Sequence, residues 1–90
     1  MLVVSLVFSM KLYKFYKSNC APCYTLGRIL STIKIPDGIE LVELNVDLPE
    51  NKELAKSYGA KKVPYLVFED KSKSIEGSQT RESVINFLMV

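Results

Sequence analysis

The hydrophobic period of this chain changes on either side of a short cysteine-containing loop at residues 20–23, and this change constrains the fold most strongly. Before the loop, residues 11–16 read KLYKFY, an aromatic-rich run typical of a β-strand. From Pro22 to about Ile33, apolar residues recur at spacings of three and four, which predicts a helix with one apolar face. Residues 39–46 alternate in polarity, as a second strand does. A strand, a helix and a strand in this order predict two parallel strands joined by a right-handed crossover.

The remainder of the chain adds a short helix and a hairpin. Pro49 suits a first helical turn, residues 50–58 predict the helix, and Gly59 is placed to end it in a left-handed conformation. Residues 65–68 (YLVF) predict a third strand, and residues 74–76 predict a weak fourth one. Because a short polar turn joins them, these two strands should pair as an antiparallel hairpin.

A last helix is predicted near the C-terminus. Thr80 can cap it, and its core-facing residues are predicted to be Val84, Ile85, Phe87 and Leu88. The element order is therefore β-α-β-α-β-β-α. This order predicts an α/β fold in which a four-stranded mixed sheet carries helices on both faces.

The composition excludes several classes of protein. The 90 residues predict one domain, and 48% hydrophobic with 24% charged residues is a globular rather than a disordered composition. The net charge is only +2 and the Lys and Glu residues are interspersed, so a nucleic-acid-binding role is not predicted. Histidine is absent, so a Ser-His or Cys-His nucleophile pair cannot form within this chain.

The first ten residues contain no Lys or Arg and are mostly apolar. The run from Leu2 to Phe8 is too short to span a bilayer, and a signal peptide requires a basic region that is missing here. No membrane association is therefore predicted. We interpret residues 1–9 as an extension ahead of a natural first residue Met10, with an extra edge strand as the alternative, and residues 10–90 as the domain.

The cysteine loop is Cys20-Ala21-Pro22-Cys23, between the first strand and the first helix. A helix N-terminus presents unpaired N–H groups and the positive end of the helix dipole, and both favour a thiolate. Lys17 adds a positive charge nearby, so the pKa of Cys20 is expected to fall below the ordinary thiol value of about 8.5. Cys20, the more exposed sulfur, would then attack a disulfide, and Cys23 in the first helical turn would resolve the mixed disulfide.

Three other uses of the two cysteines are alternatives to redox chemistry. A purely structural disulfide would close so short a loop that it would remove little entropy from the unfolded chain. A c-type haem site requires His directly after the second cysteine, where Tyr24 stands. A zinc site would find no further Cys or His in the chain and would need two chains. We favour redox use and predict no metal site.

Val63-Pro64 stands directly before the YLVF strand. Proline is tolerated at the start of a strand because it forfeits only one ladder donor there. The more specific interpretation is a cis peptide bond, which about 5–6% of X-Pro bonds adopt. A cis turn would bring the backbone of Val63 beside the cysteine loop, where it could pair with an extended substrate segment.

The motifs CAPC, LNVD, YG and VP and a later Gly77 follow one another in an order that resembles the thioredoxin family. The resemblance covers about residues 11–90, and the short chain is similar to small thioredoxin-like and glutaredoxin-like dithiol oxidoreductases of phages and microbes. It implies a minimal thioredoxin-like fold, with Cys20 as the nucleophile, Cys23 as the resolving thiol and Pro64 as a cis-proline beside them. Gly77 is implied to line the substrate groove.

Two charged residues depart from the family pattern. Thioredoxins keep a buried Asp on the first of these strands and a partner Lys on the next, where this chain has Lys14 and Glu43. We predict that these residues form a buried pair that tunes the thiols. Glu43 would help to deprotonate Cys23, and Lys14 would keep that carboxylate ionised or lower the thiol pKa directly. The alternative is that Lys14 snorkels to the sheet edge and Glu43 is solvated. In addition, Asn19 replaces a Trp of the family and Arg28 replaces a helix-kinking Pro.

The resemblance implies a thiol-disulfide oxidoreductase that reduces protein disulfides, with electron donation to ribonucleotide reductase as one role. No bound cofactor is implied, and the electrons would come from a thioredoxin reductase or from glutathione. A monomer in the cytoplasm is expected, since thiols stay reduced there. The alternative from a different class is a non-catalytic thioredoxin-fold binding module.

Four lysines in the second half of the chain are predicted to form a solvated face: Lys52, Lys56, Lys61 and Lys62. The alternative is that these lysines steer an acidic partner toward the protein.

Overall fold

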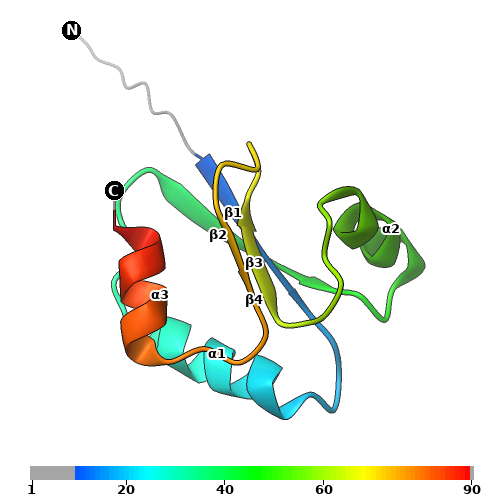
Figure 1. Ribbon diagram of the computed structural model, residues 1–90, viewed down its shortest axis with the longest axis horizontal. Helices are drawn as coiled ribbons and strands as arrows, with labels where there is room; N and C mark the ends of the chain where they lie inside the picture. Colours follow the sequence, from blue (N-terminus) through cyan, green and yellow to red (C-terminus); the bar gives the residue numbers. More distant parts are fainter. Residues whose placement is uncertain (1–9, 90) are drawn as a thin grey trace, which may run out of the picture.

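The computed structural model describes residues 10–89, so the extension predicted at residues 1–9 lies outside the described residues. The described elements are β1 (Met10–Tyr16), α1 (Ala21–Ser31), β2 (Ile39–Asn45), α2 (Pro49–Ser57), β3 (Tyr65–Phe68), β4 (Ser74–Glu76) and α3 (Arg81–Leu88). The four strands form one sheet in the order β2-β1-β3-β4 (Figure 1). The predicted element order and the four-stranded mixed sheet are therefore confirmed.

Strand β1 lies inside the sheet, with β2 and β3 on either side. It pairs in parallel with β2, and the register runs from Met10 beside Ile39 to Tyr16 beside Asn45. It pairs antiparallel with β3, and β3 pairs antiparallel with β4. The strand-helix-strand opening therefore forms the predicted crossover, and β2 is left as an edge strand of the described sheet.

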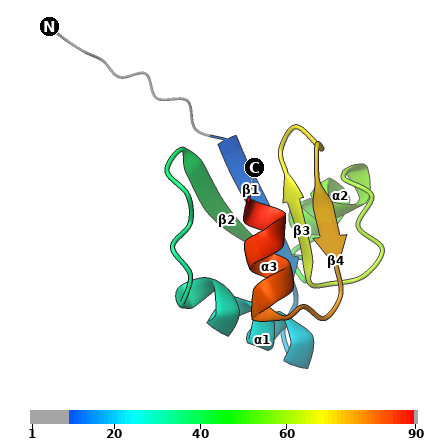
Figure 2. The ribbon, with the colours of Figure 1, turned by 60° about the vertical axis from the view of Figure 1, so that its left-hand side comes forward.

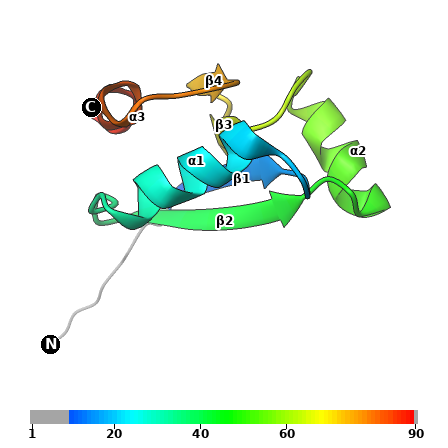
Figure 3. The same ribbon diagram turned by 90° about the horizontal axis from the view of Figure 1, so that it is seen from below.

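The helices cover both faces of the sheet, as predicted. Helices α1 and α3 pack on one face around a core of Leu12, Leu26, Leu30, Leu66, Phe68, Val84, Phe87 and Leu88. On the other face, residues Phe15, Tyr65 and Val67 pack with Ala55 of α2. Figure 2 shows α3 in front of the sheet, and Figure 3 shows α2 apart from α1 and α3. Alternation along each strand divides the apolar side chains between these two cores.

The helix ends largely follow the predicted signals. Helix α1 begins at Ala21, directly after its N-cap, and ends at Ser31 rather than near Ile33. It ends there because the N–H groups of Thr32 and Ile33 donate to the carbonyls three residues back, those of Ile29 and Leu30. Gly59, directly after the C-cap of α2, has a φ of 79°, which confirms the predicted left-handed conformation.

Helix α3 starts with a reciprocal cap but corrects one core assignment. The Thr80 side chain accepts the N–H of Ser83, while the Ser83 side chain accepts the N–H of Thr80. Ile85, predicted to face the core, is instead 36% exposed. At about 100° per residue, Ile85 lies beyond the edge of the stripe formed by Val84, Phe87 and Leu88 and is therefore more exposed than they are.

Candidate active site

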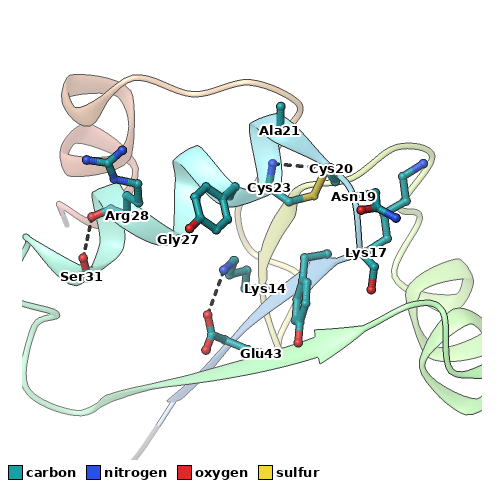
Figure 4. A pocket seen from close by; sticks show the side chains of 13 residues that line it. Lys14, Lys17, Asn19, Cys20, Ala21, Cys23, Gly27, Arg28, Ser31 and Glu43 are labelled. Atoms are coloured by element: carbon teal, nitrogen blue, oxygen red, sulfur yellow. Dashed lines mark hydrogen bonds and ion pairs between the residues drawn. A yellow bond between two sulfur atoms is a disulfide. The ribbon is translucent and has the colours of Figure 1, made fainter.

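The two cysteines lie where the chain passes from β1 into α1. Cys20 is the N-cap of α1 and Cys23 lies in the first turn of the helix. A disulfide joins them, with the two Cα atoms 5.2 Å apart (Figure 4). Two intervening residues and the start of a helix are therefore sufficient to bring the sulfurs together.

The two sulfurs differ in their access to solvent. Cys20 is partly exposed, whereas Cys23 is only 4% exposed. The backbone N–H of Cys23 donates to the Sγ atom of Cys20 over 3.2 Å, so the sulfur occupies the place of an N-cap acceptor. This donor and the helix dipole act on the exposed sulfur, which is where a thiolate would attack.

The loop before Cys20 is held in a specific backbone conformation. Asn19 has a φ of 56°, in the left-handed region that Asn tolerates better than most residues. The backbone N–H of Ser18 donates to Asp47 Oδ2 over 3.1 Å, which ties the loop to the segment after β2. Hydrogen bonds from Ser18, followed by the charges of Lys17 and Lys52, hold the pKa of Asp47 below its ordinary value. Asp47 was not predicted as a site residue, although it is the last residue of the LNVD motif.

A groove of about 940 Å³ runs beside the disulfide, and we call it the cysteine groove. Its lining comes from β1, the following loop, α1 and β2: Lys14, Tyr16, Lys17, Ser18, Asn19, Cys20, Ala21, Cys23, Tyr24, Gly27, Arg28, Ser31 and Glu43. The groove therefore contains both sulfurs together with three of the residues predicted to tune them.

Lys14 and Glu43 are neighbours in the β1–β2 register and form the predicted ion pair. The Nζ atom of Lys14 lies 2.9 Å from Glu43 Oε2 and 5.1 Å from the centre of the Tyr16 ring. The Lys14 side chain is only 7% exposed, whereas that of Glu43 is 51% exposed. The prediction that both charges are buried is therefore wrong for Glu43, because β2 is an edge strand and leaves its carboxylate open to water.

The ammonium group of Lys14 lies beneath α1. A Cβ atom at Gly27 would be only 3.1 Å from Lys14 Nζ, so the missing side chain makes room for this group. Cys23 and Gly27 are four residues apart and share one face of the helix. Figure 4 shows Lys14 between Glu43 on one side and the α1 residues Cys23 and Gly27 on the other. Gly27 was not predicted; its signal is a glycine inside a helix, where it costs stability.

The remaining predicted residues gather at the start of β3. The Val63-Pro64 bond is cis, as the more specific interpretation proposed, and Pro64 is fully buried. The backbone N–H of Gly77 donates to the Pro64 carbonyl over 2.8 Å, and Gly77 has a φ of 79°. Val63 does not line the cysteine groove but a second one, and Lys17 is common to both.

We call this second groove, of about 730 Å³, the lysine groove. It is lined by Lys17, Val46, Asp47, Lys52, Ala55, Lys56, Ala60, Lys61, Lys62 and Val63. All four lysines that were predicted to form a solvated face lie here and are exposed.

Residues 10–89 contain no group of three or more His, Cys, Asp or Glu side chains placed to hold a metal ion. None of their helices has the length and apolar character needed to cross a membrane.

The comparisons with known proteins agree with this geometry. The family model described as thioredoxin matches residues 6–89. The chain belongs to the thioredoxin family. A solved structure of a mutant thioredoxin from Halobacterium salinarum NRC-1 is similar to it, with a TM-score of 0.75 and 26% identity over 90% of this chain and 73% of that chain.

Thioredoxin-family membership explains the disulfide at the start of α1. Its CxxC pair is the redox-active disulfide of a thioredoxin-type oxidoreductase, and the family typically works without a bound cofactor on disulfides of proteins. The predicted family and type of enzyme are thus confirmed. The Lys14–Glu43 ion pair links the neighbouring strands β1 and β2.

Proposed function

We propose that this protein reduces disulfides of partner proteins by dithiol-disulfide exchange through Cys20 and Cys23. The observation that carries the proposal is the disulfide at the N-terminus of α1, in which one sulfur is partly exposed and the other is buried. An incoming disulfide can reach Cys20, while Cys23 stays within bonding distance of it.

In the first step, the Cys20 thiolate attacks one sulfur of the substrate disulfide. The S–S bond of the substrate breaks, and a mixed disulfide forms between Cys20 and the substrate. The departing substrate thiolate takes a proton from solvent. The N–H of Cys23, the helix dipole and the charge of Lys17 favour the attacking thiolate.

In the second step, Cys23 loses its proton and attacks the Sγ atom of Cys20. The mixed disulfide breaks, the second substrate thiolate leaves and is protonated, and the Cys20–Cys23 disulfide forms. Two electrons have then passed from the protein to the substrate. We assign Lys14 to stabilise the Cys23 thiolate through its charge beneath α1, and Glu43 to pass the proton to water because its carboxylate is half exposed.

We assign the binding of the substrate backbone, next to the substrate cysteine that is attacked, to Val63, Pro64 and Gly77. Two observations support this assignment. The backbone N–H of Gly77 donates to the Pro64 carbonyl, and Val63 lines a groove that also includes Lys17. The oxidised protein would then be recharged by a thioredoxin reductase or by glutathione. Ribonucleotide reductase is one proposed acceptor of the electrons. We further propose that the protein is a monomer and works in the cytoplasm.

The test uses a synthetic peptide disulfide and the two single variants Cys20→Ser and Cys23→Ser. Cys20→Ser should abolish reduction. Cys23→Ser should stop after the first step and accumulate a mixed disulfide, which mass spectrometry detects as protein plus one peptide strand. Comparing the rate of reduction with NADPH and thioredoxin reductase against the rate with glutathione and glutathione reductase identifies the electron source. Failure of the reduced wild-type protein to reduce the peptide would contradict the proposal and favour the non-catalytic binding module.

A further inference from the structure

The lysine groove concentrates positive charge that the chain as a whole does not carry. It contains five lysines and one aspartate, a net charge of +4, whereas the whole chain has a net charge of +2. The rest of the chain, with 7 basic and 9 acidic residues, therefore carries −2. One side of the active site is thus strongly basic while the remaining surface is weakly acidic.

Most of these ammonium groups have no anionic partner within residues 10–89. Only Lys56 forms an ion pair, with Glu53 at 3.6 Å, and both side chains are largely exposed. The Asp47 carboxylate accepts a hydrogen bond from Ser18 and contacts no lysine as an ion pair. Several like charges facing one groove repel each other until an anion enters.

The groove adjoins the place where a substrate would be attacked. Lys17 lines it together with the cysteine groove, and Val63 precedes the cis-proline. The rest of the lining is mostly small and apolar, which leaves room for an extended chain: Val46, Ala55, Ala60 and Val63. A Cβ atom added to Gly77 would lie 3.5 Å from the Cδ atom of Lys62, so the Lys62 side chain reaches toward Gly77.

We propose that the lysine groove binds an acidic segment of the partner protein that lies next to the attacked cysteine in the partner's sequence. This inference rests on the proposed function and adds its substrate class, namely protein disulfides flanked by Asp or Glu. Carboxylates spread along an extended segment can meet the separate ammonium groups one by one, while its backbone passes over Val63.

The lining favours a polypeptide over other anions. Lysines act as separate point charges, and the groove has no Arg for bidentate binding of a phosphate. It also has no aromatic side chain on which a nucleic-acid base could stack. An acidic peptide needs neither feature.

The experiment compares two peptide disulfides that differ only in having Glu or Gln beside the disulfide. The reduced wild-type protein should favour the Glu peptide by about fivefold to twentyfold in kcat/KM at low salt. The double variant Lys52→Glu/Lys61→Glu should remove or reverse this preference. The matched control Lys11→Glu/Lys34→Glu changes the net charge equally at exposed lysines outside both grooves, and should keep the preference to within about twofold.

Equal reduction of both peptides by the wild-type protein would overturn this inference and leave the proposed function intact. An equal loss of preference in both double variants would also overturn it, because net charge alone would then explain the effect.

Reduction of neither peptide would refute the proposed function. Binding of a Glu peptide with Ser in place of Cys, measured by fluorescence anisotropy on the oxidised protein, still decides the inference in that case. Equally tight binding of a single-stranded oligonucleotide of the same charge would overturn the assignment to an acidic peptide.

Discussion

The cysteine groove and the lysine groove share Lys17, but only the cysteine groove contains a buried lysine beside its exposed cations Lys17 and Arg28. In the cysteine groove, Lys14 is 7% exposed and lies 2.9 Å from the Glu43 carboxylate. In the lysine groove, the lysines are exposed. Among residues 10–89, Lys56 alone of them forms an ion pair, and its side chain is 67% exposed. A buried, paired charge acts on a fixed neighbour with little screening, whereas exposed charges act on partners that arrive from solution.

The largest effect should come from removing the partner of the buried charge. Glu43→Gln leaves Lys14 beneath α1 without its counterion. We expect the free energy of unfolding to fall by about 1–3 kcal/mol. This loss is smaller than the loss expected for a fully buried ion pair, because Glu43 is half exposed. Resolution of the mixed disulfide should also slow. Denaturant unfolding and rapid-quench kinetics measure the two effects.

The control for this change is Glu40→Gln, an exposed residue on the same strand that takes part in no ion pair within residues 10–89. It should change stability by no more than about 0.5 kcal/mol. If the two variants lose the same stability and resolve at the wild-type rate, Glu43 has neither the structural nor the chemical role assigned to it.

Lys14→Met removes the buried charge itself and should separate chemistry from stability. Methionine can fill similar space, and the half-exposed Glu43 can be hydrated, so stability should change by less than about 1.5 kcal/mol. Attack by Cys23 should slow by about tenfold near pH 7, since its thiolate loses a nearby positive charge. The decay of the mixed disulfide in a single turnover measures this rate. A wild-type decay rate would show that Lys14 has no part in resolution.

Salt should distinguish the grooves without any substitution. Raising the salt from about 0.02 M to about 0.5 M should lower kcat/KM for the Glu peptide about threefold to tenfold, since it screens the exposed lysines. The resolution rate should change by less than about twofold, because Lys14 and Cys23 are shielded from the ions. Equal salt dependence of the two steps would remove the distinction between the grooves.

The smallest effect should come from Asp47, which borders the lysine groove. Its folded-state pKa lies below the ordinary value of 3.8, chiefly because Ser18 donates to its carboxylate. Its contribution to stability is complete above that value and is lost as the pH falls through the lower folded-state pKa. Asp47→Asn should therefore lose less stability than the wild type as the pH falls from 3.8.

Thermal unfolding measured against pH tests this prediction. Asp37→Asn removes an exposed carboxylate that forms no side-chain hydrogen bond within residues 10–89, and it serves as the control. If Asp47→Asn and the wild type lose stability in parallel over this acid range, the hydrogen bond from Ser18 does not stabilise the fold.

Local patterns were sufficient to predict most of the fold. The bounds of β3 and β4 were predicted without error, because short β-forming runs stand between turn-forming residues. The cap at Thr80 was also predicted, because capping depends on a few adjacent residues. Ile85 was misplaced because the width of a buried helix face depends on what covers it.

The site was predictable only in part. The positions of Cys20 and Cys23 at a helix start follow from the sequence, and the pairing of Lys14 with Glu43 follows from the family pattern. The exposure of Glu43 depends on the sheet order, which leaves β2 at an edge. The space that Gly27 leaves for the lysine depends on how α1 packs over β1.

The sequence by itself determined the succession of strands and helices and the place of two thiols at a helix start, because periodicity, caps and turns operate over a few neighbouring residues. Only the tertiary structure decided which charges are buried, which face water and which lie in the same groove. The lysine groove joins residues as far apart in the sequence as Lys17 and Lys62, which meet only when distant segments pack together. The burial of a charge is a property of those distant neighbours and not of its own segment.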